Sequence, residues 1–122
     1  MARILPPDLE DRLAEGDRPF LLDIRPEADY RAGAIDGSHN VPVYDDLRGG
    51  DEAALRDHLN EIPDGREVVV VCKMGVVAKR GTRILEEEGY DAATLAGGMS
   101  GWNGYLNGSL TYRLRSLIWR FF

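Results

Sequence analysis

The sequence predicts an α/β domain built on a mainly parallel sheet with helices on both faces. Three observations support this prediction. Four consecutive valines, Val68–Val71, are typical of a central strand that is buried on both faces. Short apolar runs alternate along the chain with segments of helical spacing. The 122 residues, 43% of them hydrophobic and 30% charged, are enough for one hydrophobic core and too few for two.

The first part of the chain alternates strand and helix signals. Residues 4–5 can form only a short edge strand, because the two prolines that follow cannot donate to a ladder. Asp8 is then the expected N-cap of a short amphipathic helix over residues 9–16, which ends at a glycine. Residues 20–24 are typical of a buried strand. Residues 26–33 predict a second helix, opened by proline at N1 and closed by glycine.

Turns separate the elements expected in the rest of the chain. In order, we expect a turn and a short strand in residues 35–42, a polar turn-forming segment in 44–50, a helix over 52–59, a turn at 63–65, the valine strand, a helix from about 77 to 88, a short strand over 92–95, and a glycine-rich turn at 97–102 that leads into a further helix.

The only cysteine follows the valine run directly. Cys72 is therefore expected at the carboxyl end of the central strand, the edge where open α/β sheets bind ligands. The next helix directs free N–H groups of its first turn toward the sulfur, and with the helix dipole they favour a thiolate or a charged sulfur adduct. Lys73 and Lys79, the only lysines, add positive charge nearby. The sequence predicts a reactive cysteine; a buried structural thiol is the alternative.

Charge and cysteine usage argue against several classes of protein. A net charge of -6 argues against a general nucleic-acid binder, because a phosphate backbone requires a clustered positive surface. The N-terminus lacks the charged-then-apolar pattern of a signal segment, and one cysteine forms no internal disulfide, so we expect a cytoplasmic protein. His39, His58 and the cysteine have spacings unrelated to those of metal ligands, so no metal site is expected.

Three sequence blocks occur in the order and at the spacing of a known family. They are residues 22–25 with Tyr30 and residues 33–42, then residues 70–75, then residues 89–91 followed by residues 95–102. On these blocks the chain resembles the single-domain rhodaneses, which are sulfurtransferase modules. The resemblance covers residues 4–107 and implies a rhodanese-like α/β fold with five parallel strands, in a domain of residues 1–108.

The resemblance also implies which residues carry the chemistry. Cys72 is then the nucleophile that accepts a sulfane sulfur as a persulfide and passes it to an acceptor. The backbone amides after it form a cradle for the persulfide, at Lys73, Met74, Gly75, Val76, Val77 and Ala78. A run of amides around one sulfur is an anion nest, so the resemblance implies neither metal nor cofactor. Gly75 suits such a loop because glycine tolerates positive φ.

Two loop positions depart from the family pattern. Family loops often carry a polar residue at the position of Val76 and an arginine at that of Val77. Their loss weakens the case for thiosulfate, whose two negative charges suit a guanidinium fork, and favours a persulfide or a protein-bound sulfur donor. Lys73 can supply a point charge instead. Phosphatase chemistry, known on the same fold, is not expected, because Ala78 occupies the position of the arginine that it requires.

The sequence therefore predicts a rhodanese-type sulfurtransferase with a small sulfur donor, thiosulfate or a persulfide. The chain has no second cysteine to resolve a persulfide, so the acceptor is external: cyanide in an assay, or a thiol or a sulfur-carrier protein. The alternative is a non-catalytic rhodanese-like module that binds a partner. Cys72 favours the enzyme, whereas Val76 and Val77 favour the module.

Three further positions are expected to be structural. Asp23 and Arg25, at the end of the second strand, predict an ion pair that braces the site rather than a contact with substrate. His39 is expected to hydrogen-bond within the scaffold rather than act as a general base. Trp102 is expected to pack in the core beneath the glycine turn.

Residues 109–122 form a C-terminal amphipathic extension that the family pattern does not cover. Helical spacing places five apolar residues on one face and arginines elsewhere: Leu110, Leu114, Leu117, Ile118 and Phe121. The segment is too short to span a bilayer, which takes about 20 apolar residues. It either covers the core or a dimer seam, or docks peripherally on a membrane or an acidic protein, since basic residues mixed with aromatics suit such surfaces.

Overall fold

The computed structural model describes residues 2–108, and the C-terminal extension predicted at residues 109–122 lies outside them. Five strands form one all-parallel sheet in the order β1-β5-β4-β2-β3. Their bounds are β1 Arg3–Ile4, β2 Phe20–Asp23, β3 His39–Asn40, β4 Val68–Val71 and β5 Ala92–Leu95. The predicted α/β fold with a parallel sheet is confirmed, with the valine strand at its centre and the short first strand at one edge.

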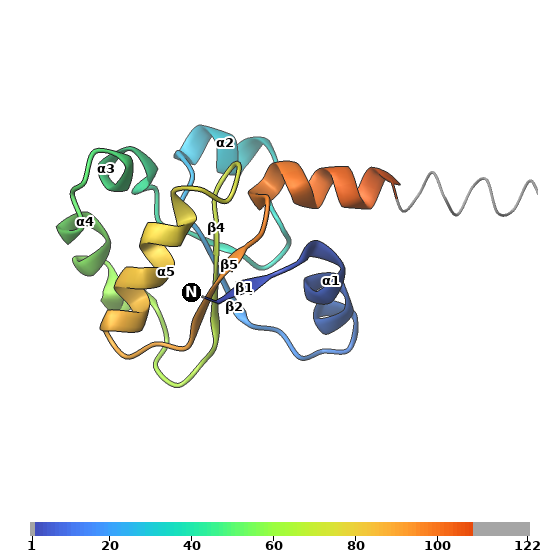
Figure 1. The fold of residues 1–122 in the computed structure, drawn as a ribbon, viewed down its shortest axis with the longest axis horizontal. Helices are drawn as coiled ribbons and strands as arrows, with labels where there is room; N and C mark the ends of the chain where they lie inside the picture. Colours follow the sequence, from blue (N-terminus) through green and yellow to red (C-terminus); the bar gives the residue numbers. More distant parts are fainter. Residues whose placement is uncertain (1, 109–122) are drawn as a thin grey trace, which may run out of the picture.

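Helices cover both faces of the sheet (Figure 1). The helical segments are α1 Pro6–Ala14, α2 Glu27–Ala32, α3 Tyr44–Arg48, α4 Ala53–Arg56, the 3-10 turn η1 Leu59–Glu61, α5 Ala78–Glu87, and a last helix, described over residues 98–108 and here named the 98–108 helix. In Figure 1, α3, α4 and α5 lie on one side of the sheet, and α1 and the 98–108 helix on the other.

The valine strand divides the core into two clusters. Val68 and Val70 pack with α3, α4 and α5, whereas Val69 and Val71 pack with α1 and the 98–108 helix. All four are at most 1% exposed, because alternate side chains of a strand point to opposite faces. Trp102 lies in the second cluster at 7% exposure, as predicted. Cys72 continues the alternation and joins the first cluster.

Two predicted helix starts are wrong. Asp8 is not an N-cap, because α1 begins at Pro6 with Leu5 as its N-cap. Prolines are tolerated in the first turn, where the N–H that they lack has no helical partner. Likewise Pro26 is the N-cap of α2 rather than its first helical residue.

Two segments between β3 and β4 also differ from the prediction. The polar stretch 44–50 was expected to be a turn, yet it contains α3, whose Leu47 is 1% exposed in the core. The helix expected over residues 52–59 is shorter: α4 ends at Arg56 and η1 follows. No helix in the described part of the chain is long and apolar enough to cross a membrane.

Candidate functional site: the Cys72 loop

Cys72 lies where the sequence places it, directly after β4. Residues 72–77, here named the Cys72 loop, connect that strand to α5. The Cys72 residue is 1% exposed, and the Gly75 amide donates a hydrogen bond to its Sγ over 3.1 Å. One amide of the predicted cradle therefore contacts the sulfur; the wider cradle from Lys73 to Ala78 stays a prediction.

The backbone of the turn after β5 packs directly against the backbone of the Cys72 loop. Gly75 has φ +80°, and a Cβ on it would lie 2.9 Å from the Gly97 nitrogen. Gly98 has φ +58°, and a Cβ on it would lie 2.7 Å from the Gly75 nitrogen and closer still to the Cys72 carbonyl oxygen. Only glycine fits both positions without displacing backbone. The loop and the turn are thus packed backbone against backbone.

Hydrogen bonds add to this packing. The Met99 amide donates to the Cys72 carbonyl over 2.8 Å, and the Ser100 amide donates to the Lys73 carbonyl over 2.9 Å. Orphan N–H groups at the start of the 98–108 helix therefore hold the carbonyls of the cysteine and its neighbour. This partner of the site was not predicted from the sequence. Its signal was the Gly97-Gly98 pair at the end of the last strand.

The predicted ion pair between Asp23 and Arg25 is present and buried. Asp23 is 0% exposed, and its carboxylate accepts hydrogen bonds from three nitrogen atoms of Arg25: the backbone amide at 3.0 Å, Nε at 3.1 Å and Nη2 at 2.9 Å. Arg25 Nη2 also donates to the Gly33 carbonyl over 2.8 Å. The Ile24 amide donates to the Val71 carbonyl over 2.9 Å, which ties this brace to the strand that carries the cysteine.

The predicted loop residues divide into an exposed rim and a buried base. Met74 is 58% and Val76 is 68% exposed, and the Lys73 side chain is exposed as well. Val77 at 8% and Ala78 at 0% belong to the core cluster beneath α5. The valine found where the family often has arginine thus packs inward.

Arg80 has no part in the loop. Its Nη1 donates to the Leu47 carbonyl over 2.8 Å, which fastens the end of α3 to α5. The nearest arginine along the chain after the cysteine is therefore engaged in packing two helices rather than directed at the sulfur.

The two histidines share one carboxylate, that of Glu61. His39 Nε2 lies 2.8 Å from Glu61 Oε1, and His58 Nδ1 bonds the other carboxylate oxygen. Hydrogen bonds from His58, and then from His39, lower the pKa of Glu61. His39 is a scaffold hydrogen-bonder, as predicted. Within residues 2–108 no group of three or more His, Cys, Asp or Glu side chains could hold a metal ion.

The fold and site together define a parallel α/β domain that encloses a lone thiol in a short loop at the end of its central strand. The sequence profile of the rhodanese-like domain matches residues 5–105, and the chain belongs to that family.

Relatives and solved structures agree with this assignment. Over 102 residues the chain is 30% identical to the maize protein named adenylyltransferase and sulfurtransferase MOCS3-1. The aligned region covers 83% of this chain and 21% of the maize protein. It is 28% identical over 95 residues to a protein of Allochromatium vinosum named sulfurtransferase, covering 77% and 80% of the two chains. The crystal structure of a rhodanese-like domain protein from Staphylococcus aureus matches this structure with a TM-score of 0.71 and 25% sequence identity. The match covers 84% of this chain and 91% of the Staphylococcus chain.

Proposed function

We propose that this protein is a sulfurtransferase that carries sulfane sulfur as a persulfide on Cys72. The observation that carries the proposal is the position of Cys72 Sγ, at the carboxyl end of β4 and 3.1 Å from the Gly75 amide. The names of the maize and Allochromatium relatives support the same chemistry. Because the chain spans about a fifth of the maize protein, the proposal includes only sulfur transfer.

In the loading step, the Cys72 thiolate attacks the sulfane sulfur of the donor. With thiosulfate, the bond between the two sulfurs of the donor breaks, sulfite leaves with the electron pair, and Cys72 becomes a persulfide anion. The Gly75 amide points at the inner sulfur, where an N–H donor stabilises negative charge. The exposed Lys73, which follows Cys72 directly in the loop, adds positive charge there.

In the discharge step, an external nucleophile attacks the outer sulfur. The bond between the outer and inner sulfurs breaks, and its electron pair returns to Cys72 as a thiolate. The sequence contains one cysteine, so the acceptor comes from outside the chain: cyanide in an assay, or a thiol or sulfur-carrier protein in the cell. A reducing compartment such as the cytoplasm suits a cycle that depends on a free thiol.

The rim of the loop favours an organic donor over thiosulfate. Met74 and Val76 give this rim two exposed apolar side chains, and Val77 packs into the core where the family often has arginine. An apolar rim contributes more to the binding of an organic persulfide than to that of a small dianion. We therefore expect loading to be faster with a persulfide than with thiosulfate.

Intact mass measurement tests the proposal. The protein is incubated with thiosulfate, or with a small organic persulfide, and compared with Cys72→Ser. The expected result is a gain of one sulfur atom on the wild type and none on the variant, with the larger yield from the persulfide. A folded wild-type protein that gains no sulfur from either donor contradicts the proposal.

The second candidate is a non-catalytic module that binds a partner through the Cys72 loop. The exposure of Met74 and Val76 beside a cysteine that is 1% exposed favours it. The same measurement separates the two functions, because a binding module keeps its fold in both proteins and forms no sulfur adduct.

A further inference from the structure

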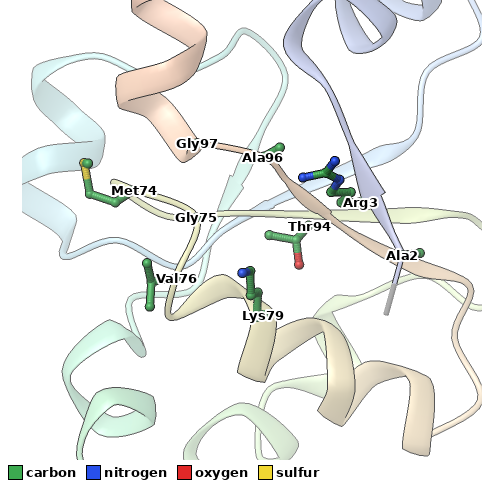
Figure 2. Close-up of a pocket in the computed structure, with 9 residues that line it drawn as sticks. All are labelled: Ala2, Arg3, Met74, Gly75, Val76, Lys79, Thr94, Ala96 and Gly97. Carbon is green, nitrogen blue, oxygen red and sulfur yellow. The ribbon is translucent and has the colours of Figure 1, made fainter.

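A pocket of about 370 Å³ lies beside the Cys72 loop, at the β1 edge of the sheet (Figure 2). Figure 2 shows Arg3 on β1, Thr94 on β5 and Lys79 at the start of α5 around this hollow, with loop residues Met74, Gly75 and Val76 along one side. The volume is within the range of small-molecule sites, about 300 to 1,000 Å³.

The charge of this pocket is opposite to that of the whole protein. Arg3 and Lys79 both line it, whereas the chain carries a net charge of -6. Among residues 2–108, the ion pairs of the structure involve neither Arg3 nor Lys79. The hydroxyl of Thr94 is already hydrogen-bonded to that of Thr82 over 2.7 Å. Two cations that form no ion pair within the described residues therefore line a pocket whose other walls are mostly apolar.

Gly75 belongs both to the wall of this pocket and to the surroundings of the sulfur. It lines the pocket, and its amide lies 3.1 Å from Cys72 Sγ. Val77, by contrast, is buried in the core and adds no charge to the loop. In addition to Lys73 of the loop, a negatively charged substrate therefore finds counter-charges beside the loop, on β1 and α5.

We propose that this pocket binds a small organic anion, and that in the cycle it holds the carboxylate of the acceptor thiol. The two cations pair with the carboxylate, and the apolar wall takes the short carbon chain. The acceptor thiolate then attacks the outer sulfur of the persulfide, Cys72 leaves as a thiolate, and the acceptor departs as a persulfide anion. The acceptor role rests on the proposed function, whereas anion binding does not.

Anion binding is tested without sulfur chemistry. Butyrate, and butyramide as its neutral match, are titrated into the protein while amide NMR signals are followed. We expect saturable shifts at Gly75, Lys79 and Ala96 with butyrate only. Arg3→Gln/Lys79→Gln is expected to weaken butyrate binding about threefold or more, since exposed ion pairs are individually weak. Absence of saturable shifts at these amides overturns the proposal.

The acceptor role is tested by discharge of the loaded protein. The measured quantity is the ratio of rate constants for 3-mercaptopropionate and 2-mercaptoethanol, which cancels general effects of a substitution on the loop. The ratio is expected to fall about threefold or more in Arg3→Gln/Lys79→Gln. It should stay unchanged in Arg48→Gln/Arg66→Gln, which removes two arginines that do not line the pocket.

An unchanged ratio in the first variant, or an equal fall in the control, overturns the acceptor role while leaving the sulfurtransferase proposal intact. Failure of every protein to load sulfur overturns the sulfurtransferase proposal and the acceptor role with it, and the butyrate titration still decides whether the pocket binds an anion.

Discussion

The closest packing at the site makes Gly98→Ala the sharpest test of how the Cys72 loop is held. A methyl group on Gly98 would lie 2.7 Å from the Gly75 nitrogen and 2.7 Å from the Lys73 carbonyl carbon. The three atoms nearest to it are all backbone atoms, so these contacts cannot be relieved by rotation of a side chain. Gly16→Ala is the matched control, because Gly16 has φ +79° and no atom within 4 Å of the added carbon.

The two substitutions share a conformational cost and differ in packing. Placing alanine in the left-handed region costs about 1 kcal/mol, part of which is offset in the unfolded chain. Gly98→Ala adds about 1 to 3 kcal/mol of overpacking. It also strains the hydrogen bonds from Met99 and Ser100 to the loop, worth about 1 kcal/mol each. We expect a loss of roughly 3 to 5 kcal/mol for Gly98→Ala and about 1 kcal/mol for Gly16→Ala.

Thermal unfolding measures the difference. For 122 residues, 1 kcal/mol corresponds to roughly 4 °C in Tm, so we expect a fall of at least about 10 °C for Gly98→Ala and about 4 °C for the control. Alkylation of Cys72 by iodoacetamide should accelerate only in Gly98→Ala, because only that substitution displaces the loop. Equal Tm values for the two variants would refute the claim that the turn after β5 closes the loop.

Three further outcomes are expected. Asp23→Asn should lower the free energy of unfolding by about 3 to 5 kcal/mol, measured in urea, because it leaves the buried Arg25 guanidinium without its counter-charge; a loss below about 1 kcal/mol contradicts this. The pKa of Glu61 is lower in the folded than in the unfolded protein, so the ionised carboxylate stabilises the fold above about pH 4.5, and this stabilisation is lost as the pH falls through the folded-state pKa. The difference in free energy of unfolding between the wild type and Glu61→Gln should therefore become smaller when unfolding is measured at increasingly acid pH. Deleting residues 109–122 should leave Tm unchanged but reduce sedimentation with anionic vesicles; a lower Tm would favour the core-covering alternative.

The features predicted correctly from the sequence are those whose signal lies in neighbouring residues of the chain. The four valines indicated the central strand, and the cysteine after them indicated the ligand-binding edge, because a strand buried on both faces needs no knowledge of its neighbours to be recognised. The prolines after Ile4 likewise indicated an edge strand. Asp23 ends β2 and Arg25 follows it by two residues, so their pairing was also visible locally.

Structure that depends on distant residues was not predictable in this way. The helix α3 has five residues and only Leu47 buried, and the Arg80 side chain of α5 binds its last carbonyls. Glu87 and Glu88, acids at a helix end where the dipole disfavours them, are paired with Arg56 on α4. The closure of the loop by Gly98 joins positions that are far apart in the chain. In each case the stabilising partner comes from another element.

These distant contacts bear on which anions the proposed sulfurtransferase would select. The end of β4 and the start of α5 bury Cys72 and Val77, and the turn after β5 holds the loop from behind, so the interior of the loop has little room for an added guanidinium. The Arg25 guanidinium is already paired with the Asp23 carboxylate. Cations near the sulfur line two hollows: Lys73 of the loop lies in one with Ser100 and Asn103, and Arg3 and Lys79 line the pocket at the β1 edge. If the proposed sulfur-transfer cycle holds, these two hollows allow donor and acceptor anions to be selected by different residues, and substitutions in one hollow should change one half of the cycle without changing the other.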